Sequence, residues 1–257
     1  MPIITLTTDW NKDDYYIGAV KGAIYSSCTD VIVVDISHQI KPFNIFQAAF
    51  ILKNCYKYYP EGTVHLLGVK TESFAEQKYM VAYSQGQYFV GTDNGIFSLL
   101  FKDDEQVNYF LIEDTKPTSF AVLDVYVKIA CSLIKGEKVE SIGQKVDTIN
   151  RRVPLRATIE DNVISGSIVY IDSFQNAITN VSRDLFNRVG NGRAFKIYVQ
   201  SNHYVISKIN TTYQETSAGE LLAIFNSLNL LEIAINGGNA AELLNLDINS
   251  SIRIKFQ

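Results

Sequence analysis

The chain has 257 residues, of which 47% are hydrophobic and 19% are charged. This length predicts one large domain or two modest ones, and this composition excludes a disordered chain. The formal net charge of −4 argues against a general nucleic-acid-binding protein, because such proteins need a basic surface.

The first half of the chain alternates strand patterns with helix patterns. We expect strands over residues 3–7, 31–36 and 63–69, a hairpin with strands 79–83 and 88–90, and helices over 15–25, 44–58 and 124–134. The continuous apolar run at 31–36 is typical of a strand covered on both faces. This alternation predicts an α/β domain over residues 1–155, with a mostly parallel sheet flanked by helices.

The pattern changes after about residue 150, where Arg151, Arg152, Val153 and Pro154 indicate a linker. Short strands separated by glycine- and asparagine-rich turns follow, over residues 166–171, 194–200, 204–209, 221–225, 231–235 and 251–256. Such spacing predicts an all-β domain over residues 156–257, folded as a small barrel or a curled sheet.

The three cysteines, Cys28, Cys55 and Cys131, lie far apart and form no CxxC pair. This spacing argues against a disulfide scaffold and against a thiolate metal site, so we expect three small buried side chains in a reducing compartment. The N-terminus lacks the pattern of a signal peptide, and no apolar run is long enough to cross a membrane. We therefore expect a soluble cytoplasmic protein with no metal and no membrane partner.

The common catalytic motifs are missing from this sequence: it contains no GxSxG, HExxH, P-loop or GxGxxG. His65 lies inside an apolar strand, which favours a hydrogen-bonded core residue over a general base. His38 lies at a strand end, where sites are common, but a hydrogen-bonded turn residue is the favoured interpretation.

Asp9 is the candidate of greatest interest, because it falls where the first predicted strand ends. Ligands of open α/β sheets bind at this carboxyl edge, and a carboxylate there can accept both hydroxyl groups of a ribose. The alternative is a turn residue that caps the next helix together with Asp13 and Asp14. Asp93 and Asn94, after the predicted strand 88–90, are consistent with a simple turn.

Seven segments together resemble one known family. They are TLTTD (residues 5–9), DYYIGAVKG (14–22), VDISHQI (34–40), PEGTVH (60–65), TDNG (92–95), IDSFQNAITN (171–180) and NSLNLLEIA (226–234). In this order and spacing, the chain resembles the S-adenosylmethionine (SAM) hydroxide adenosyltransferases, which are related to fluorinating and chlorinating enzymes. The resemblance runs nearly from end to end.

The resemblance implies a homotrimer whose ligand, SAM or adenosine, binds between the first domain of one subunit and the second domain of its neighbour, without a cofactor. The below-average charged fraction agrees with buried subunit surface. By motif, Asp9 would hold the ribose hydroxyls, Asp14 would lie near the methionine end, Phe43 would pack on the adenosine, and Phe120 would join the binding residues. Asp172 would pair with the methionine amine and Ser227 with its carboxylate. Phe174, Asn176, Glu232 and the backbone near Ile235 would frame the adenine.

The catalytic positions depart from the family pattern. The family reaction is attack of water on C5′ of the adenosyl group, and its hydrolases use an aspartate, an arginine and a histidine. Those positions carry Lys70, Gln77 and Ala121 in this sequence. Val122 replaces the small hydroxyl residue of the fluorinating relatives, so the resemblance does not imply a halogenase. We expect the triad positions to be non-functional.

Lys70 also raises an electrostatic question, because the sulfonium of SAM is a cation. Two like charges 4 Å apart repel by about 4 kcal/mol at an effective dielectric constant of 20. Lys70 could turn outward to pair with Glu72 or Glu76, be deprotonated by burial, or face a ligand without a sulfonium. Two functions are therefore favoured: a weakened SAM hydrolase, or a non-catalytic trimer that binds a nucleoside or nucleotide. A third, a purely structural trimer without a ligand, is disfavoured because Asp9, Asp172, Asn176 and Ser227 are retained.

Overall fold

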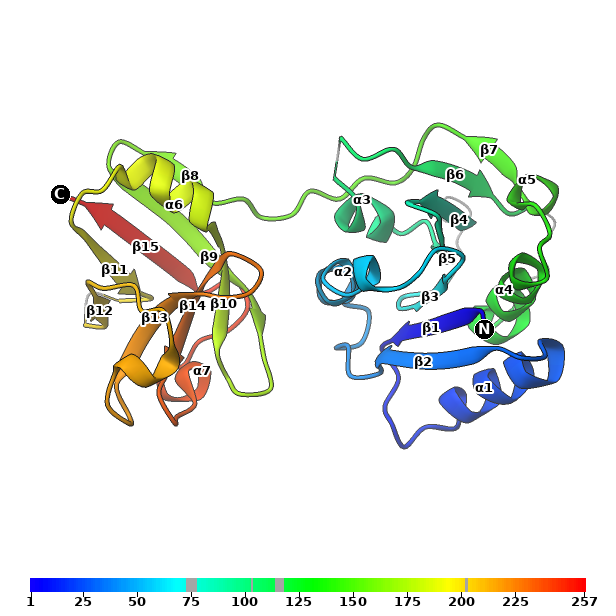
Figure 1. Cartoon of the computed structure of the whole chain (residues 1–257), viewed down its shortest axis with the longest axis horizontal. Coiled ribbons are helices and arrows are strands. Elements are labelled where there is room, and N and C mark those ends of the chain that lie inside the picture. The colour runs from blue at the N-terminus through cyan, green and yellow to red at the C-terminus, as the bar shows by residue number, and fades with distance from the viewer. Residues whose placement is uncertain (73–77, 103, 114–117, 202) are drawn as a thin grey trace. The chain divides into compact units, whose positions relative to one another are not determined.

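The computed structural model describes residues 1–72, 78–102, 104–113, 118–201 and 203–257. The chain divides into two compact units, Met1–Pro154 and Leu155–Gln257 (Figure 1). Each unit has its own hydrophobic core.

In the described part of the first unit, seven strands form one mixed sheet in the order β2-β1-β3-β5-β4-β6-β7 (Figure 1). Strands β2, β1, β3 and β5 run parallel, and β5, β4, β6 and β7 pair antiparallel. The strands are β1 (Ile3–Thr8), β2 (Ile32–Ser37), β3 (Val64–Gly68), β4 (Tyr79–Ser84), β5 (Gln87–Thr92), β6 (Asn108–Leu111) and β7 (Gln144–Val146). The α/β class is confirmed. The sheet is mixed rather than mostly parallel because the β4–β5 hairpin reverses the chain.

Helices cover both faces of this sheet (Figure 1). Side chains of α1 and α4 share one core cluster with Ile4 and Leu6, whereas side chains of α2 and α3 share the other with Leu67 and Phe89. The helical segments are α1 (Tyr15–Ser27), α2 (Ile45–Lys53), the 3₁₀ turn η1 (Tyr56–Tyr58), α3 (Ile96–Leu100), the π-helical turn η2 (Val122–Tyr126), α4 (Val127–Ile134) and α5 (Val139–Ile142).

His65 on β3 is a buried and fully hydrogen-bonded core residue, as the sequence predicts. Its Nδ1 lies 2.7 Å from Thr5 Oγ1, and its Nε2 lies 2.7 Å from Gln87 Oε1. Because Gln87 Nε2 donates to the carbonyl oxygen of Tyr59, the amide oxygen of Gln87 faces His65. Nε2 of His65 therefore carries the proton, and the neutral ring accepts from Thr5.

Acid should destabilise the protein through His65. Burial lowers the pKa of His65 to about 4, against a hydrogen bond to Gln87 that raises it. The unfolded chain, with an ordinary histidine pKa, binds this proton first, so stability is full above about pH 6.5 and falls as the pH drops towards 4. Between pH 7 and pH 4.5 we expect a loss on the order of 2 kcal/mol in urea unfolding. His65→Gln, which cannot titrate, should lose less by that amount, and an equal loss in both proteins would contradict this account.

The second unit is a curled antiparallel sheet in the order β12-β11-β15-β9-β10-β14-β13, with β8 paired to β9 among its described residues. A bridge between Asn210 and Ile224 on β13 nearly closes it into a barrel. The strands are β8 (Thr158–Glu160), β9 (Val163–Ile171), β10 (Ala177–Ser182), β11 (Phe195–Val199), β12 (Val205–Ile206), β13 (Leu221–Phe225), β14 (Leu230–Ile235) and β15 (Ser251–Phe256).

The predicted class of this unit, a small barrel or curled sheet of β-strands, is confirmed. Its described residues also include the short helices α6 (Arg183–Gly190) and α7 (Ala240–Leu243) and the 3₁₀ turn η3 (Tyr213–Glu215). Ser182 caps α6 by accepting a hydrogen bond from the N–H of Leu185 at 3.1 Å, and Asn191 ends the helix in the left-handed conformation. Both signals are visible in the sequence, and they outweigh the strand-like spacing around them.

The expectation of three separate buried cysteines is wrong for two of them. Cys28, at the end of α1, and Cys131, in α4, are both buried and form a disulfide. They lie 103 residues apart in sequence, so their spacing could not reveal that α1 and α4 pack together. Cys55 is a free thiol, and burial raises its pKa.

Candidate functional site

Asp9 follows β1 directly, at the edge where the parallel strands β1, β2 and β3 end. Its Oδ2 accepts a hydrogen bond from the backbone N–H of Phe43 at 2.8 Å, and the carboxylate also accepts one from the backbone of Lys70. Phe43 and Lys70 have φ angles of +64° and +49°, in the left-handed region that residues other than glycine seldom adopt. Two turns from distant parts of the chain thus converge on one carboxylate.

The environment of Asp9 leaves its carboxylate half-buried. Burial raises the pKa of Asp9, the N–H groups of Phe43 and Lys70 lower it, and the nearby charge of Glu72 raises it, with a net upward shift. A carboxylate has about four acceptor positions, so Asp9 keeps capacity for hydroxyl groups of a ligand. Asp9 does not act as the cap of α1, a place taken by Asp14, which is exposed and accepts from the N–H of Asn11.

An apolar and aromatic wall lies beside Asp9. A Cβ on Gly68, the last residue of β3, would come within 2.9 Å of Thr8 and 3.2 Å of Val122, so only glycine fits there. The rings of Trp10 and Phe120 pack edge to face with centroids 5.4 Å apart. Ala121, which directly precedes η2, is buried and has no polar side-chain atom.

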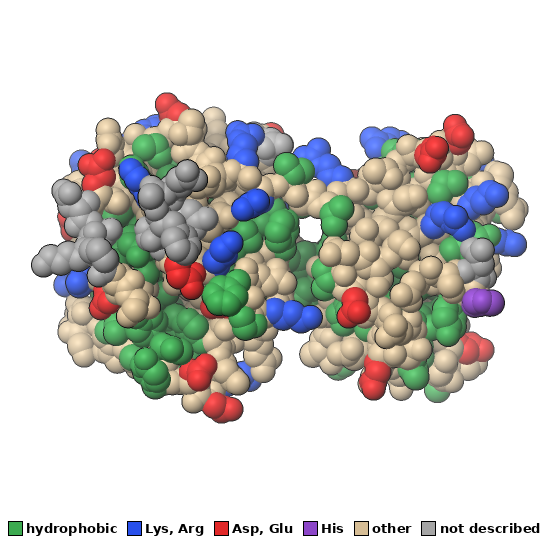
Figure 2. All heavy atoms as spheres, turned by 180° about the vertical axis from the view of Figure 1, so that it is seen from behind, with side chains coloured by type: hydrophobic (Ala, Val, Ile, Leu, Met, Phe, Trp, Pro, Cys, Tyr) green, Lys and Arg blue, Asp and Glu red, His purple; other side chains and the backbone are tan. Residues whose placement is uncertain are grey.

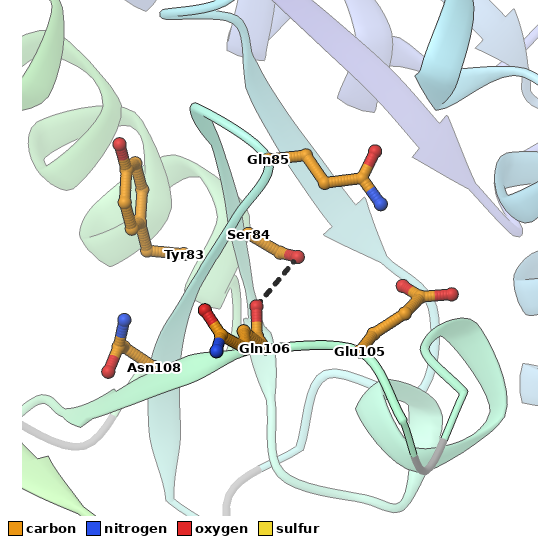
Figure 3. Close-up of a pocket in the computed structure, with 6 residues that line it drawn as sticks. All are labelled: Tyr83, Ser84, Gln85, Glu105, Gln106 and Asn108. Atoms are coloured by element: carbon orange, nitrogen blue, oxygen red, sulfur yellow. Dashed lines mark hydrogen bonds between the residues drawn. The ribbon is translucent and has the colours of Figure 1, made fainter.

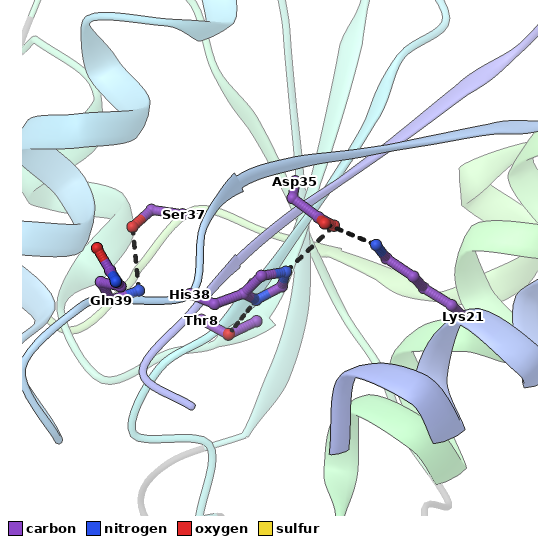
Figure 4. A network of polar contacts seen from close by, with 6 residues as sticks. All are labelled: Thr8, Lys21, Asp35, Ser37, His38 and Gln39. Atoms are coloured by element: carbon purple, nitrogen blue, oxygen red, sulfur yellow. Dashed lines mark hydrogen bonds and ion pairs between the residues drawn. The ribbon is translucent and has the colours of Figure 1, made fainter. Parts of the chain in front are cut away.

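His38 belongs to a polar network behind this wall (Figure 4). Its Nδ1 lies 2.7 Å from Thr8 Oγ1, and its Nε2 lies 3.1 Å from Asp35 Oδ1. Asp35 Oδ2 in turn accepts from Lys21 Nζ at 2.6 Å. Burial raises the pKa of Asp35, but the hydrogen bonds from Lys21 and His38 outweigh it and hold that pKa below its usual range. The structure therefore makes His38 a hydrogen-bonded turn residue, as the sequence favours.

The remaining residues predicted for the triad are Lys70 and Gln77. The backbone of Lys70 adjoins Asp9, and Lys70 is half-buried. Gln77 lies outside the described residues, as does Glu76, one of the two partners considered for Lys70.

In the second unit, Asp172, Phe174 and Asn176 share one tight turn between β9 and β10. Asp172 Oδ1 accepts from the N–H groups of Phe174 at 2.9 Å and of Asn176 at 2.8 Å. Asp172 Oδ2 accepts from Nδ2 of Asn176 at 3.1 Å. These bonds hold the Asp172 carboxylate rigidly and leave the Phe174 ring 74% exposed. Ile235, at the end of β14, lies near this turn, because β10 and β14 are antiparallel neighbours.

Glu232, expected to frame an adenine, is only 3% exposed, and both of its oxygens already have protein partners. Oε1 accepts from Tyr213 Oη at 2.6 Å, and Oε2 accepts from Asn226 Nδ2 at 3.0 Å. Burial and the Glu232 carboxylate raise the pKa of Tyr213. Glu232 thus fixes Asn226 and, through it, the turn that presents the exposed Ser227. Sequence reasoning assigned no role to Tyr213 or Asn226. Their shared partner, Glu232, is buried in β14, and the sequence does not show that either side chain reaches it.

The turn after β5, which sequence reasoning took for a turn alone, also reaches this region. Asn94 Nδ2 donates to the carbonyl oxygen of Lys70 at 2.8 Å. The Asp93 carboxylate accepts from the N–H of Asn150 at 2.9 and 3.0 Å, and burial raises its pKa. Apart from their place in the TDNG segment of the family resemblance, no signal in the sequence distinguishes these side chains from ordinary turn residues.

A separate pocket of about 350 Å³ does not include any predicted site residue (Figure 3). It is lined by Tyr83, Ser84, Gln85, Glu105, Gln106 and Asn108. The pocket adjoins the turn between β4 and β5. It therefore lies at the start of β5, whereas Thr92 and the turn that reaches Lys70 lie at its other end. Over the described residues, no group of three or more His, Cys, Asp or Glu side chains could hold a metal ion, and no helix is long and apolar enough to cross a membrane.

Comparisons with known proteins cover both units. Residues 4–143 match the family model of the SAM hydroxide adenosyltransferase N-terminal domain, and residues 166–253 match that of the C-terminal domain. An (R)-S-adenosyl-L-methionine hydrolase from Methanocaldococcus jannaschii is 30% identical, over 100% of this chain and 97% of the relative. A fluorinase from Actinopolyspora mzabensis is 26% identical, over 98% of this chain and 97% of the relative. The crystal structure of an uncharacterized conserved protein from Thermotoga maritima matches with a TM-score of 0.87 and 25% identity, over 99% of this chain and 100% of that one.

Proposed function

Because the chain belongs to the SAM hydroxide adenosyltransferase family, we propose that it binds the adenosyl group of SAM and that its hydrolysis of SAM is weak or lost. The observation that carries this proposal is the Asp9 carboxylate. It lies half-buried at the carboxyl ends of the parallel strands β1, β2 and β3, is oriented by the backbone N–H groups of Phe43 and Lys70, and keeps acceptor capacity for a ribose.

The proposed binding roles fall into two half-sites. In the first unit, Asp9 accepts the ribose hydroxyls, Asp14 lies near the methionine end, and Phe43 and Phe120 pack on the adenosine. In the second, Asp172 pairs with the methionine amine, Ser227 bonds the carboxylate, and Phe174, Asn176 and the backbone near Ile235 frame the adenine. Glu232 contributes by holding Asn226 and the Ser227 turn.

The weakness of hydrolysis follows from the chemistry of the reaction. A water oxygen bonds to C5′, the C5′–S bond breaks with its electron pair on the methionine sulfur, and the water loses one proton. The reaction therefore needs a group that orients the water and accepts that proton. Ala121 has no polar side-chain atom, and the ammonium of Lys70 has no lone pair to accept with. Gln77, at the third triad position, carries a neutral amide that is not a base, so positioning and desolvation are the contributions that remain.

We also propose a homotrimer in which each site is completed by a neighbouring subunit. Phe43 is 61% exposed and Phe174 is 74% exposed, although both belong to the proposed half-sites. Figure 2 shows further hydrophobic side chains at the surface of each unit. Light scattering should give about three times the mass of one chain. The proposal further includes a cytoplasmic location, no cofactor, and no nucleic-acid or membrane partner.

A product assay tests the proposed function. Purified protein at near-stoichiometric concentration is incubated with SAM, and bound and released compounds are separated by chromatography. We expect bound SAM or adenosine, with adenosine and methionine released barely above the spontaneous background. Release in proportion to protein, abolished by Asp9→Ala, would show that hydrolysis survives. Failure to bind either compound would overturn the adenosyl site.

One observation favours a second candidate function. The Lys70 backbone adjoins Asp9 and the residue is half-buried, so its cationic side chain leaves the chain next to a ligand held there. A cation at this position suits an anionic nucleotide better than a sulfonium. Titration with adenosine, AMP and SAM separates the two: tighter binding of AMP than of SAM identifies a nucleotide-binding protein without hydrolase activity.

A further inference from the structure

Three consecutive backbone carbonyls after β3 are held by side chains of the turn that follows β5. Asn94 Nδ2 donates to the carbonyl oxygens of Lys70 at 2.8 Å and Val69 at 3.2 Å. Thr92 Oγ1 donates to the carbonyl oxygen of Thr71 at 3.0 Å. The segment 69–71 is therefore fixed from outside itself, by two residues more than twenty positions further along the chain.

The two side chains that hold this segment are themselves fixed. Asn94 is buried, and its Oδ1 accepts from the N–H of Ile96 at 3.1 Å, so its Nδ2 must face the carbonyls. The hydroxyl groups of Thr92 and Tyr126 lie 2.7 Å apart in the core. Because Thr92 gives its single proton to the Thr71 carbonyl, Tyr126 is the donor in that pair.

The consequence reaches Asp9 through Lys70. Lys70 has a φ of +49°, a conformation that an L-residue keeps only when its surroundings impose it. The N–H of Asp9 donates to the carbonyl oxygen of Gly68 at 3.3 Å, which places the segment that follows β3 beside Asp9, and the Lys70 backbone there donates to the Asp9 carboxylate. We propose that Asn94, supported by Thr92, is a positioning residue of the adenosyl site, because it holds Lys70 where its N–H orients Asp9. This inference rests on the proposed function for the role of Asp9 in binding.

The turn after β5 also has a purely structural role, which a test must separate from the positioning of Lys70. Asp93 anchors Asn150, and nearby Ser98 Oγ accepts from the N–H of Arg152 at 2.8 Å, so both tie down the end of the first unit. Ser98→Ala is the matched control. It removes a hydrogen bond close to the same turn but leaves the segment 69–71 and all charges unchanged.

The test is the pKa of Asp9 in the ligand-free protein, measured by carbon NMR of its carboxyl group. Burial and the charge of Glu72 raise the pKa of this carboxyl, and the N–H groups of Phe43, Lys70 and Asp9 itself lower it. Asn94→Ala should release Lys70, remove a bond that favours the ionised form, and raise the pKa of Asp9 by about one unit. Ser98→Ala should leave it unchanged. An unchanged pKa in Asn94→Ala would overturn the inference.

Adenosine titrations across pH then link this shift to binding. Protonated Asp9 is neutral and has turned one acceptor position into a donor, so it binds the ribose hydroxyls less strongly. Affinity therefore falls as the pH drops through the pKa of Asp9, and that fall should begin about one unit higher in Asn94→Ala. Should Asn94→Ala not fold, Thr92→Val, which keeps Asn94, should show a smaller shift in the same direction. A shifted pKa in a protein that binds no adenosine would leave the positioning role standing and refute only the proposed function.

Discussion

Replacing Asp9 with alanine should weaken adenosine binding by at least about a hundredfold, because the variant loses two charge-assisted hydrogen bonds to the ribose. The effect on stability should be small by comparison. Asp9 accepts from the backbone of Phe43 and Lys70, both in partly exposed turns that water can reach. We expect a loss of about 1–2 kcal/mol, or a few degrees in Tm.

Two further variants make this result specific. Asp13→Ala removes the same charge from the same loop. Asp13 is exposed, and its backbone N–H donates to Asn11 rather than to the turn that holds Phe43, so the affinity of this variant for adenosine should be unchanged. Asp9→Asn keeps one acceptor oxygen and should fall between alanine and the native protein. Calorimetric titration with adenosine measures all three. Native-like affinity in Asp9→Ala, combined with a large drop in Tm, would make Asp9 a structural residue and remove the ribose-binding role.

The hydrophobic patterns were sufficient to predict most of the fold. The apolar runs around β1, β2 and β3 and the hairpin of β4 and β5 follow directly from the strand period. β6 and β7 lie at the far edge of the sheet, are short and carry polar residues, so their period is weak. α6 was missed because it is only eight residues long, of which four are polar, and lies among strands, although Ser182 marks its start.

Without the family resemblance, only Asp9 in the candidate site could be predicted from the residues themselves. Asp9 could be found because a strand end is visible in the sequence. Its partners could not, because Phe43 and Lys70 adopt left-handed conformations that nothing in their side chains requires. Asn94 and Thr92 act on backbone atoms of a segment far from them in sequence. Such contacts arise from packing of the turns, and a single sequence holds no record of them.

The Cys28–Cys131 disulfide should be the largest single contributor to the stability of the first unit. It closes a loop of 103 residues, and the chain-entropy model assigns about 4–5 kcal/mol to a loop of that length. Cys28→Ala with Cys131→Ala should therefore lower the Tm by roughly 10 °C. Reductant should have a similar effect on the native protein. Cys55→Ala, which removes the third and unpaired cysteine, is the matched control and should respond to reductant as the native protein does.

Thiol counting connects this bond to the proposed location. Cytoplasmic thiols are usually kept reduced, so a cytoplasmic protein with this disulfide is unusual, and the two expectations oppose each other. Cells are lysed with a thiol-blocking reagent, and the protein is denatured and analysed by mass spectrometry. One blocked cysteine, Cys55, would show that the bond exists in the cell and would count against a reducing compartment. Three blocked cysteines would show that α1 and α4 pack without the bond in the cell. The Tm of the protein kept reduced would then be the physiologically relevant one. A Tm that does not respond to reductant, together with three free thiols in the purified protein, would contradict the disulfide itself.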